Sequence, residues 1–247
     1  MPRYKIADVV FDAEHLYKYT AALCKNYLYH GEQSPEFVAN VEQKDIDDEK
    51  AREGAAGFPD YYLESLALFR KLCDYVLERR DGIIFHSSAV AVDGKAYLFT
   101  APSGTGKSTH ARLWRQVFGD KVVYINDDKP IIRCIDGEFY VYGTPWNGKH
   151  HLDTNARAKL EAICEIRRGK VNRIRELSSK EMLMVVLNQT IRPTDERKFD
   201  KLVGVLDKLL TTARLYRLEC NISEEAARTS YNAMVERAED KEKGEKL

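Results

Sequence analysis

The chain has 247 residues, 44% of them hydrophobic and 32% charged, and its 39 basic side chains balance 39 acidic ones. These proportions are typical of a soluble globular protein and exclude an intrinsically disordered one. A net charge of zero argues against a nucleic-acid partner, and no apolar run approaches the ~18 residues of a membrane span. Because the polar start Met1–Lys5 has no signal-peptide pattern, we expect a cytoplasmic protein with no membrane partner.

The cysteines argue against a metal site or a disulfide framework. They are few, odd in number and scattered, with no two spaced as in a zinc motif: Cys24, Cys73, Cys134, Cys164 and Cys220. We therefore expect free thiols, mostly in or near the core.

The first 58 residues predict a small α/β lobe. Tyr4–Asp12 alternates apolar and polar residues and favours a strand, whereas 13–29 is compatible with a helix or a strand. Glu36–Val41 is a short candidate strand, and Asp45–Arg52 is a candidate helix that begins at an N-cap residue, Asp45. A Gly-rich and Pro-containing stretch, 54–59, then ends this pattern.

The next segments have clear periodicity. Apolar residues recur at helical spacing over Asp60–Arg80, which predicts a helix. Ile83–Val92, which contains His86, has the length and composition of a strand. Asp93-Gly94 is a hairpin signal, so this strand is expected to pair antiparallel with Lys95–Thr100.

The remaining elements complete an α/β pattern. We expect strands at 122–125, 131–135, 138–142, 160–166 and 214–220, a loop at 143–151, and helices at 109–118, 179–190, 195–211 and 223–239. The predicted fold is a mixed sheet with helices, in which 59–240 form a catalytic domain and 241–247 a charged tail.

The stretch between the hairpin and the following helix has the composition of a phosphate-binding loop. It reads Ala101-Pro102-Ser103-Gly104-Thr105-Gly106-Lys107-Ser108, and it departs from the strict pattern because Ala101 replaces a glycine. Backbone amides at a helix N-terminus would hold phosphate oxygens, Lys107 would reach the terminal phosphates, and Ser108 would bind Mg²⁺. The expected nucleotide-binding residues are Ser103, Gly104, Thr105, Gly106, Lys107, Ser108 and Thr109.

Two adjacent carboxylates, Asp127 and Asp128, follow the apolar strand at 122–125. Phosphoryl transfer needs an acidic group for Mg²⁺ and often a second one near the attacking oxygen. One of the pair can therefore be the base and the other the metal ligand. The alternative is a solvated turn before Lys129-Pro130.

The order of His86, the phosphate loop and Asp127-Asp128 resembles the catalytic domain of the bacterial HPr kinase/phosphorylase family. It is also similar to the phosphoenolpyruvate carboxykinases, which share that nucleotide-binding architecture. The resemblance implies that Asp127 is the general base and that Asp128 helps to hold Mg²⁺. It also implies that His86 contacts Asp127 and tunes its basicity. Without the resemblance, a lone histidine in an apolar strand is more often a core residue.

The chain departs from that family after the paired aspartates, because the family's Arg-Gly-Ile-Gly type segment is absent. Its place is taken by the loop 143–151, which argues against the protein HPr as the substrate and against a phosphorylase activity. Lys149 of this loop could stabilise the transferred phosphoryl group, and Trp146 could either line the acceptor site or pack in the core. A basic cluster could meet an anionic acceptor or lie on a solvated strand edge: Arg167, Arg168, Arg173 and Arg175.

The sequence thus predicts an ATP- and Mg²⁺-dependent kinase that phosphorylates a hydroxyl group of a small molecule or a peptide. The catalytic residues would be Asp127, His86, Lys107 and Lys149, with Ser108 and Asp128 at the metal. The alternatives are a carboxykinase-like lyase, which needs a larger domain, a non-catalytic nucleotide-binding regulatory protein, and a domain without a nucleotide site.

Overall fold

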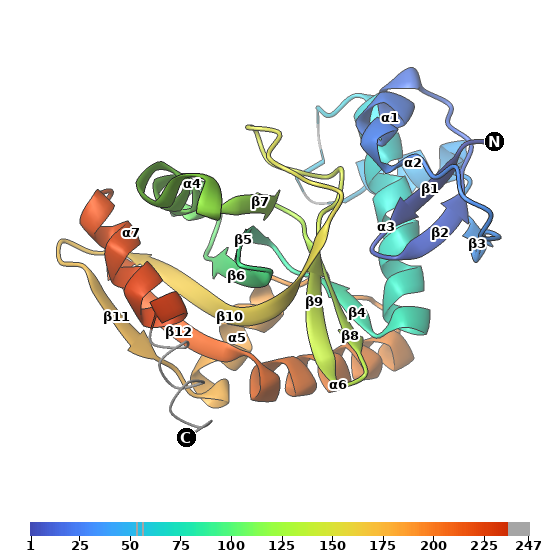
Figure 1. The fold of residues 1–247 in the computed structure, drawn as a ribbon. Coiled ribbons are helices and arrows are strands. Elements are labelled where there is room, and N and C mark those ends of the chain that lie inside the picture. Colours follow the sequence, from blue (N-terminus) through green and yellow to red (C-terminus); the bar gives the residue numbers. More distant parts are fainter. Residues whose placement is uncertain (53, 56, 237–247) are drawn as a thin grey trace.

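The computed structural model describes residues 1–52, 54, 55 and 57–236. They form a mixed α/β fold in which a nine-stranded sheet has helices on both faces and a separate three-stranded sheet lies at one end (Figure 1). Within these residues, no helix combines the length and the apolar character that crossing a membrane requires.

The elements alternate irregularly along the chain. The strands are β1 (Arg3–Ile6), β2 (Val9–Asp12), β3 (Phe37–Val38), β4 (Gly82–Ile84), β5 (Ser87–Val92), β6 (Lys95–Thr100), β7 (Val123–Asn126), β8 (Ile131–Ile135), β9 (Glu138–Tyr142), β10 (Arg157–Arg168), β11 (Arg173–Glu176) and β12 (Arg214–Cys220). The helices are α1 (Lys18–Leu23), α2 (Gln43–Lys50), α3 (Asp60–Arg80), α4 (Lys107–Phe118), α5 (Ser179–Asn188), α6 (Glu196–Thr212) and α7 (Glu224–Tyr231), with short helical turns at Lys25–Tyr27, Gly119–Lys121 and Asn232–Glu236.

The large sheet is built around the long strand β10. The strand order is β4-β8-β9-β10-β6-β5-β7, and β12 pairs with β10 beyond the end of β9 and carries β11 on its other side. Strands β6, β10 and β12 run parallel to one another, whereas the hairpins β5–β6 and β8–β9 are antiparallel. The sheet is therefore mixed, as the sequence predicts.

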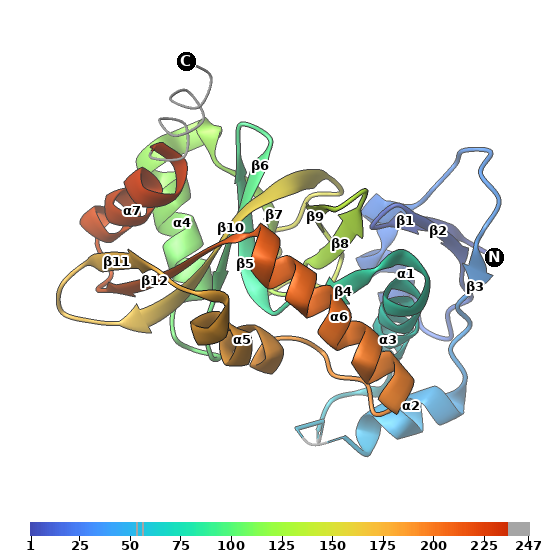
Figure 2. The same cartoon turned by 90° about the horizontal axis from the view of Figure 1, so that it is seen from below.

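Alternation along β6 assigns its side chains to two cores. Ala96 and Leu98 pack on the face covered by α5 and α6, whereas Tyr97 and Phe99 pack on the face covered by α4 and α7 (Figure 2). Because both faces are covered, β6 is buried along almost its whole length. This buried strand is the rigid support of the loop that follows it.

The N-terminal segment forms the three-stranded sheet β1-β2-β3. The single strand predicted for Tyr4–Asp12 is wrong, because the chain turns at Ala7 and Asp8, which both have positive φ, and β1 pairs antiparallel with β2. Its core is continuous with the rest of the molecule: Phe11 and Ile46 belong to the same buried cluster as Leu68 of α3.

Several predicted boundaries also shift. The strand expected over Ile83–Val92 is divided, because β4 pairs with β8 and β5 pairs with β6 and β7, so that His86 lies between strands. Asp45 is not an N-cap, since α2 begins at Gln43 and the Asp45 carboxylate accepts a hydrogen bond from the Glu42 amide. The predicted helix 223–239 is α7 followed by a π-helical turn, and its last residues and the predicted tail lie outside the described residues.

Other predictions are confirmed. The helix Asp60–Arg80 has the predicted bounds, as do the strands 131–135, 138–142 and 214–220. Asp93-Gly94 forms the hairpin turn between β5 and β6, with positive φ at both residues. The cysteines are free thiols, and four of the five are buried.

Candidate functional site

The order of the strands brings three chain segments to one edge of the sheet. Strand β5 lies between β6 and β7 and runs antiparallel to both, so the ends of β6 and β7 meet the start of β5. Ser87 pairs with Thr100, and Ala89 pairs with Asn126. Consequently the phosphate loop, His86 and the Asp127-Asp128 pair, which are remote in sequence, lie together.

The predicted phosphate loop connects β6 to α4. Gly104 and Gly106 have φ of 76° and 128°, a region that residues with a Cβ rarely adopt. The Thr105 amide donates to the Pro102 carbonyl at 3.2 Å, and Gly106 caps α4 without a side chain. The first amides of a helix have no acceptor within the helix, so this end of α4 can donate to an anion.

Lys107 lies over the loop in a buried position. Its side chain folds back, and Nζ donates to the Ala101 carbonyl at 3.0 Å. Burial lowers the pKa of Lys107, and among the described residues no carboxylate forms an ion pair with it. A phosphate oxygen could therefore replace a neutral carbonyl as the partner of this cation.

Asp127 is buried at the end of β7, with 2% of its surface exposed. Its Oδ1 accepts a hydrogen bond from the Gly148 amide at 2.5 Å, whereas its Oδ2 is buried and has no partner among the described residues. Its backbone carbonyl accepts from Ser88 Oγ at 3.2 Å and from Ser108 Oγ at 3.5 Å. Burial raises the pKa of the Asp127 carboxyl, although the Gly148 amide opposes the shift.

Asp128 has the opposite environment, because the side chains of His86 and Lys129 contact its two oxygens. Oδ1 lies 3.0 Å from His86 Nε2, and Oδ2 forms an ion pair with Lys129. Burial by itself would raise the pKa of Asp128, but the hydrogen bond from His86 and the charge of Lys129 outweigh it and hold the pKa at about 2.

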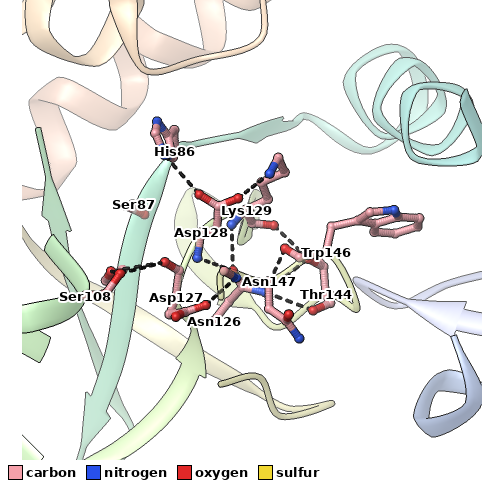
Figure 3. Close-up of polar contacts among 12 residues, drawn as sticks. His86, Ser87, Ser108, Asn126, Asp127, Asp128, Lys129, Thr144, Trp146 and Asn147 are labelled. Atoms are coloured by element: carbon pink, nitrogen blue, oxygen red, sulfur yellow. Dashed lines mark hydrogen bonds and ion pairs between the residues drawn. The ribbon is translucent and has the colours of Figure 1, made fainter. Parts of the chain in front are cut away.

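His86 therefore lies against a different carboxylate from the one expected. The family resemblance implies Asp127 as its partner, but Figure 3 shows the Asp128 carboxylate turned toward His86 and Lys129, and Asp127 extending away from them. The other ring nitrogen, Nδ1, lies 3.0 Å from Oε1 of Gln189, which follows α5. No sequence signal identifies Gln189, because it is 103 positions from His86.

Asn126 arranges the two carboxylates. Its Oδ1 accepts from the amides of Asp128 and Lys129 at 2.8 and 2.6 Å, and its Nδ2 donates to the Thr144 carbonyl at 2.9 Å. This fully buried side chain thus joins the end of β7 to the loop 143–151. An asparagine before the aspartates predicts such a turn, but not its link to Thr144.

The loop 143–151 covers Asp127 and does not present Trp146 to an acceptor. Trp146 is 4% exposed, packs on Phe69, and donates from Nε1 to the Ser65 carbonyl at 2.9 Å, so its role as a wall of the acceptor site is wrong and its alternative as a core residue is confirmed. A Cβ on Gly148 would lie 2.9 Å from Asp127 Oδ1, so only glycine permits this approach. Lys149 is exposed at the tip of the loop.

The predicted basic cluster is dispersed. Arg167 pairs with Glu165, and Arg175 pairs with Glu181. Arg168 instead reaches the phosphate loop, where Nη2 donates to the Gly104 carbonyl at 2.5 Å. A contact between β10 and this loop is thus a feature that sequence spacing does not reveal.

The site contains oxygen ligands of the kind that Mg²⁺ prefers. The Ser108 hydroxyl lies beside the Asp127 carbonyl, and Asp128 is held in its ionised form. Magnesium usually takes one or two carboxylates together with substrate phosphates and water. Ser108 and Asp128 offer oxygens of that kind, and Asp128 would exchange its ion pair with Lys129 for the ion.

Comparisons with known proteins give structural similarity but no sequence match. No family model matches the chain, and no curated protein matches it. The fold is similar to a solved structure described as the Hpr(Ser) kinase/phosphatase from Coxiella burnetii. That match has a TM-score of 0.37 and 8% sequence identity and covers 63% of this chain and 98% of the other. We therefore base the function on the geometry of the site.

Proposed function

We propose that this protein is a kinase that transfers the γ-phosphoryl group of ATP to a hydroxyl group of a small molecule or a peptide. The observation that carries the proposal is the buried Asp127 carboxyl, whose Oδ2 has no partner among the described residues, beside the phosphate loop. A carboxylate in this setting has a raised affinity for a proton and can accept one from a reacting hydroxyl group.

The loop and Lys107 bind and orient the donor. The loop amides would take the phosphate oxygens, and Lys107 would exchange the Ala101 carbonyl for the terminal phosphates. Ser108 and Asp128 would hold Mg²⁺, which when bound neutralises the charge of the phosphates. Lys149 would add a positive charge at the transferred group.

The environments of the two carboxylates divide their roles. Burial raises the pKa of Asp127, whereas His86 and Lys129 keep Asp128 ionised, and a pair separated in this way supplies one base and one permanent anion. In the transfer, the acceptor oxygen bonds to the γ-phosphorus, the bond to the bridging oxygen breaks, and ADP leaves with that electron pair. The hydroxyl proton passes to Asp127.

Labelled ATP and a panel of hydroxyl-bearing metabolites and peptides test this proposal. We expect a phosphorylated product with the wild type, none with Lys107→Ala or Asp127→Asn, and nucleotide binding that Asp127→Asn largely retains. Asp207→Asn, which changes an exposed carboxylate on α6, is the matched control and should be fully active. Normal turnover by Asp127→Asn would exclude Asp127 as the base, and tight ATP binding without any product would instead indicate a regulatory protein.

A further inference from the structure

The phosphate loop borders a cavity that the phosphoryl-transfer chemistry does not use. It measures about 350 Å³ and lies between the first turns of α4 and the ends of β10 and β12. Gly104, Thr105 and Gly106 form the wall that it shares with the loop. Its volume falls within the range of small-molecule sites.

We propose that this cavity holds the base and ribose of the nucleoside triphosphate. The proposal rests on the proposed function, since it places the nucleoside end of the same donor. Binding of the phosphates alone would account for the loop, Lys107 and the carboxylates, but it would not account for the cavity beside them.

The helical spacing of α4 puts the cavity on a different face from the carboxylates. Gly106, Thr109 and Leu113 follow one another at intervals of three and four residues, so they line one face, which borders the cavity. Ser108 instead points toward the Asp127 carbonyl. Because the loop lysine reaches the β- and γ-phosphates, the nucleoside end leaves the loop on the side away from Lys107 and Asp127.

The walls of the cavity suit a flat, partly apolar group. Leu113, Ile166 and Ile222 contribute aliphatic surface, and 79% of Ile222 is exposed. A large aliphatic side chain so exposed beside a cavity gains free energy when a base covers it.

Polar groups at the rim can orient the ribose and base. Asn221 Oδ1 accepts from Ser223 Oγ at 2.5 Å, which orients the Asn221 side chain, and the backbone N–H of Asn221 donates to Asn172 Oδ1 at 3.1 Å. Within the described residues, Asn221 Nδ2 donates to no acceptor and can donate to an oxygen or nitrogen of the ligand. Arg168 lies between the cavity and the loop and can meet the α-phosphate.

Calorimetric titration with two probes separates the nucleoside from the phosphates. The probes are MgATP and magnesium tripolyphosphate, which carries no base or ribose. We expect the wild type to bind MgATP at least tenfold more tightly, and Ile222→Ser to weaken MgATP binding about fivefold, as loss of one apolar contact implies, with no change for tripolyphosphate. Because Ile222 is exposed, this variant should fold, and an unchanged Tm would confirm it.

Val203→Ser is the matched control, since Val203 is an exposed residue of α6. It should bind both probes as the wild type does. Equal affinity of the wild type for both probes, or an unchanged MgATP affinity in Ile222→Ser, would overturn the nucleoside pocket and leave the phosphate site intact. A wild-type protein that binds neither probe would overturn the proposed function together with the pocket.

Discussion

His110 makes the stability of the protein depend on pH in a defined window. The residue lies on α4, 3% exposed, with Nε2 at 2.9 Å from Ser230 Oγ and its ring against Phe99. Burial lowers the pKa of His110 from 6.5 to about 4. Between these values the unfolded chain binds a proton that the folded protein does not. The contribution of neutral His110 to the unfolding free energy is therefore fully present above pH 6.5 and is lost as the pH falls toward 4.

The two pKa values fix the size of the effect. A pKa of 6.5 in the unfolded chain and of about 4 in the fold correspond to a loss of roughly 2 kcal/mol of unfolding free energy between pH 7 and pH 5. Urea unfolding over this range, with wild type and His110→Gln compared, isolates the contribution because the variant keeps every other titrating group. The exposed His30 supplies the control, His30→Gln. If the unfolding free energies of wild type and His110→Gln change with pH by the same amount between pH 7 and pH 5, His110 is not the source of the pH dependence.

Two further substitutions test the loop 143–151, and a third, on α6, is the control for the first. Gly148→Ala puts a Cβ 2.9 Å from Asp127 Oδ1 and breaks the charge-assisted hydrogen bond, so the unfolding free energy at pH 7 should fall by about 1.5–3 kcal/mol. Gly204→Ala, on α6 with open space around it, should instead stabilise by about 0.5–1 kcal/mol. Trp146→Ala should cost about 3–5 kcal/mol in chemical unfolding and leave ATP binding unchanged, and a cost below about 1 kcal/mol would contradict its place in the core.

The features that could be predicted from sequence are those with a local cause. The apolar spacing of Asp60–Arg80 and the turn pair Asp93-Gly94 act over a few residues, and each appears where expected. The turn between β1 and β2 was missed because Ala7-Asp8 contains neither glycine nor asparagine, yet both residues adopt positive φ. There the pairing of the two strands outweighs the preference of the turn residues.

The contacts within the site depend instead on distant segments. The phosphate loop and the paired aspartates could be recognised as candidate site residues, because their own residue types and order indicate phosphate and metal binding. The partner of His86 depends on the break between β4 and β5 and on Gln189, and the burial of Trp146 depends on α3. Periodicity records whether a residue faces a core, but not which element covers it.

Asn126 explains why two adjacent carboxylates can have opposite properties. Its side chain accepts from the amides of Asp128 and Lys129, which turns the chain so that Asp127 lies beneath Gly148 while Asp128 faces His86. Without that turn, neighbouring like charges would repel in one shared environment. The same asparagine also donates to the Thr144 carbonyl. One buried residue therefore positions both the loop 143–151 over Asp127 and the carboxylate of Asp128. Since the Gly148 amide occupies Oδ1, the oxygen of Asp127 that would meet the acceptor in the proposed reaction is Oδ2, which has no partner among the described residues.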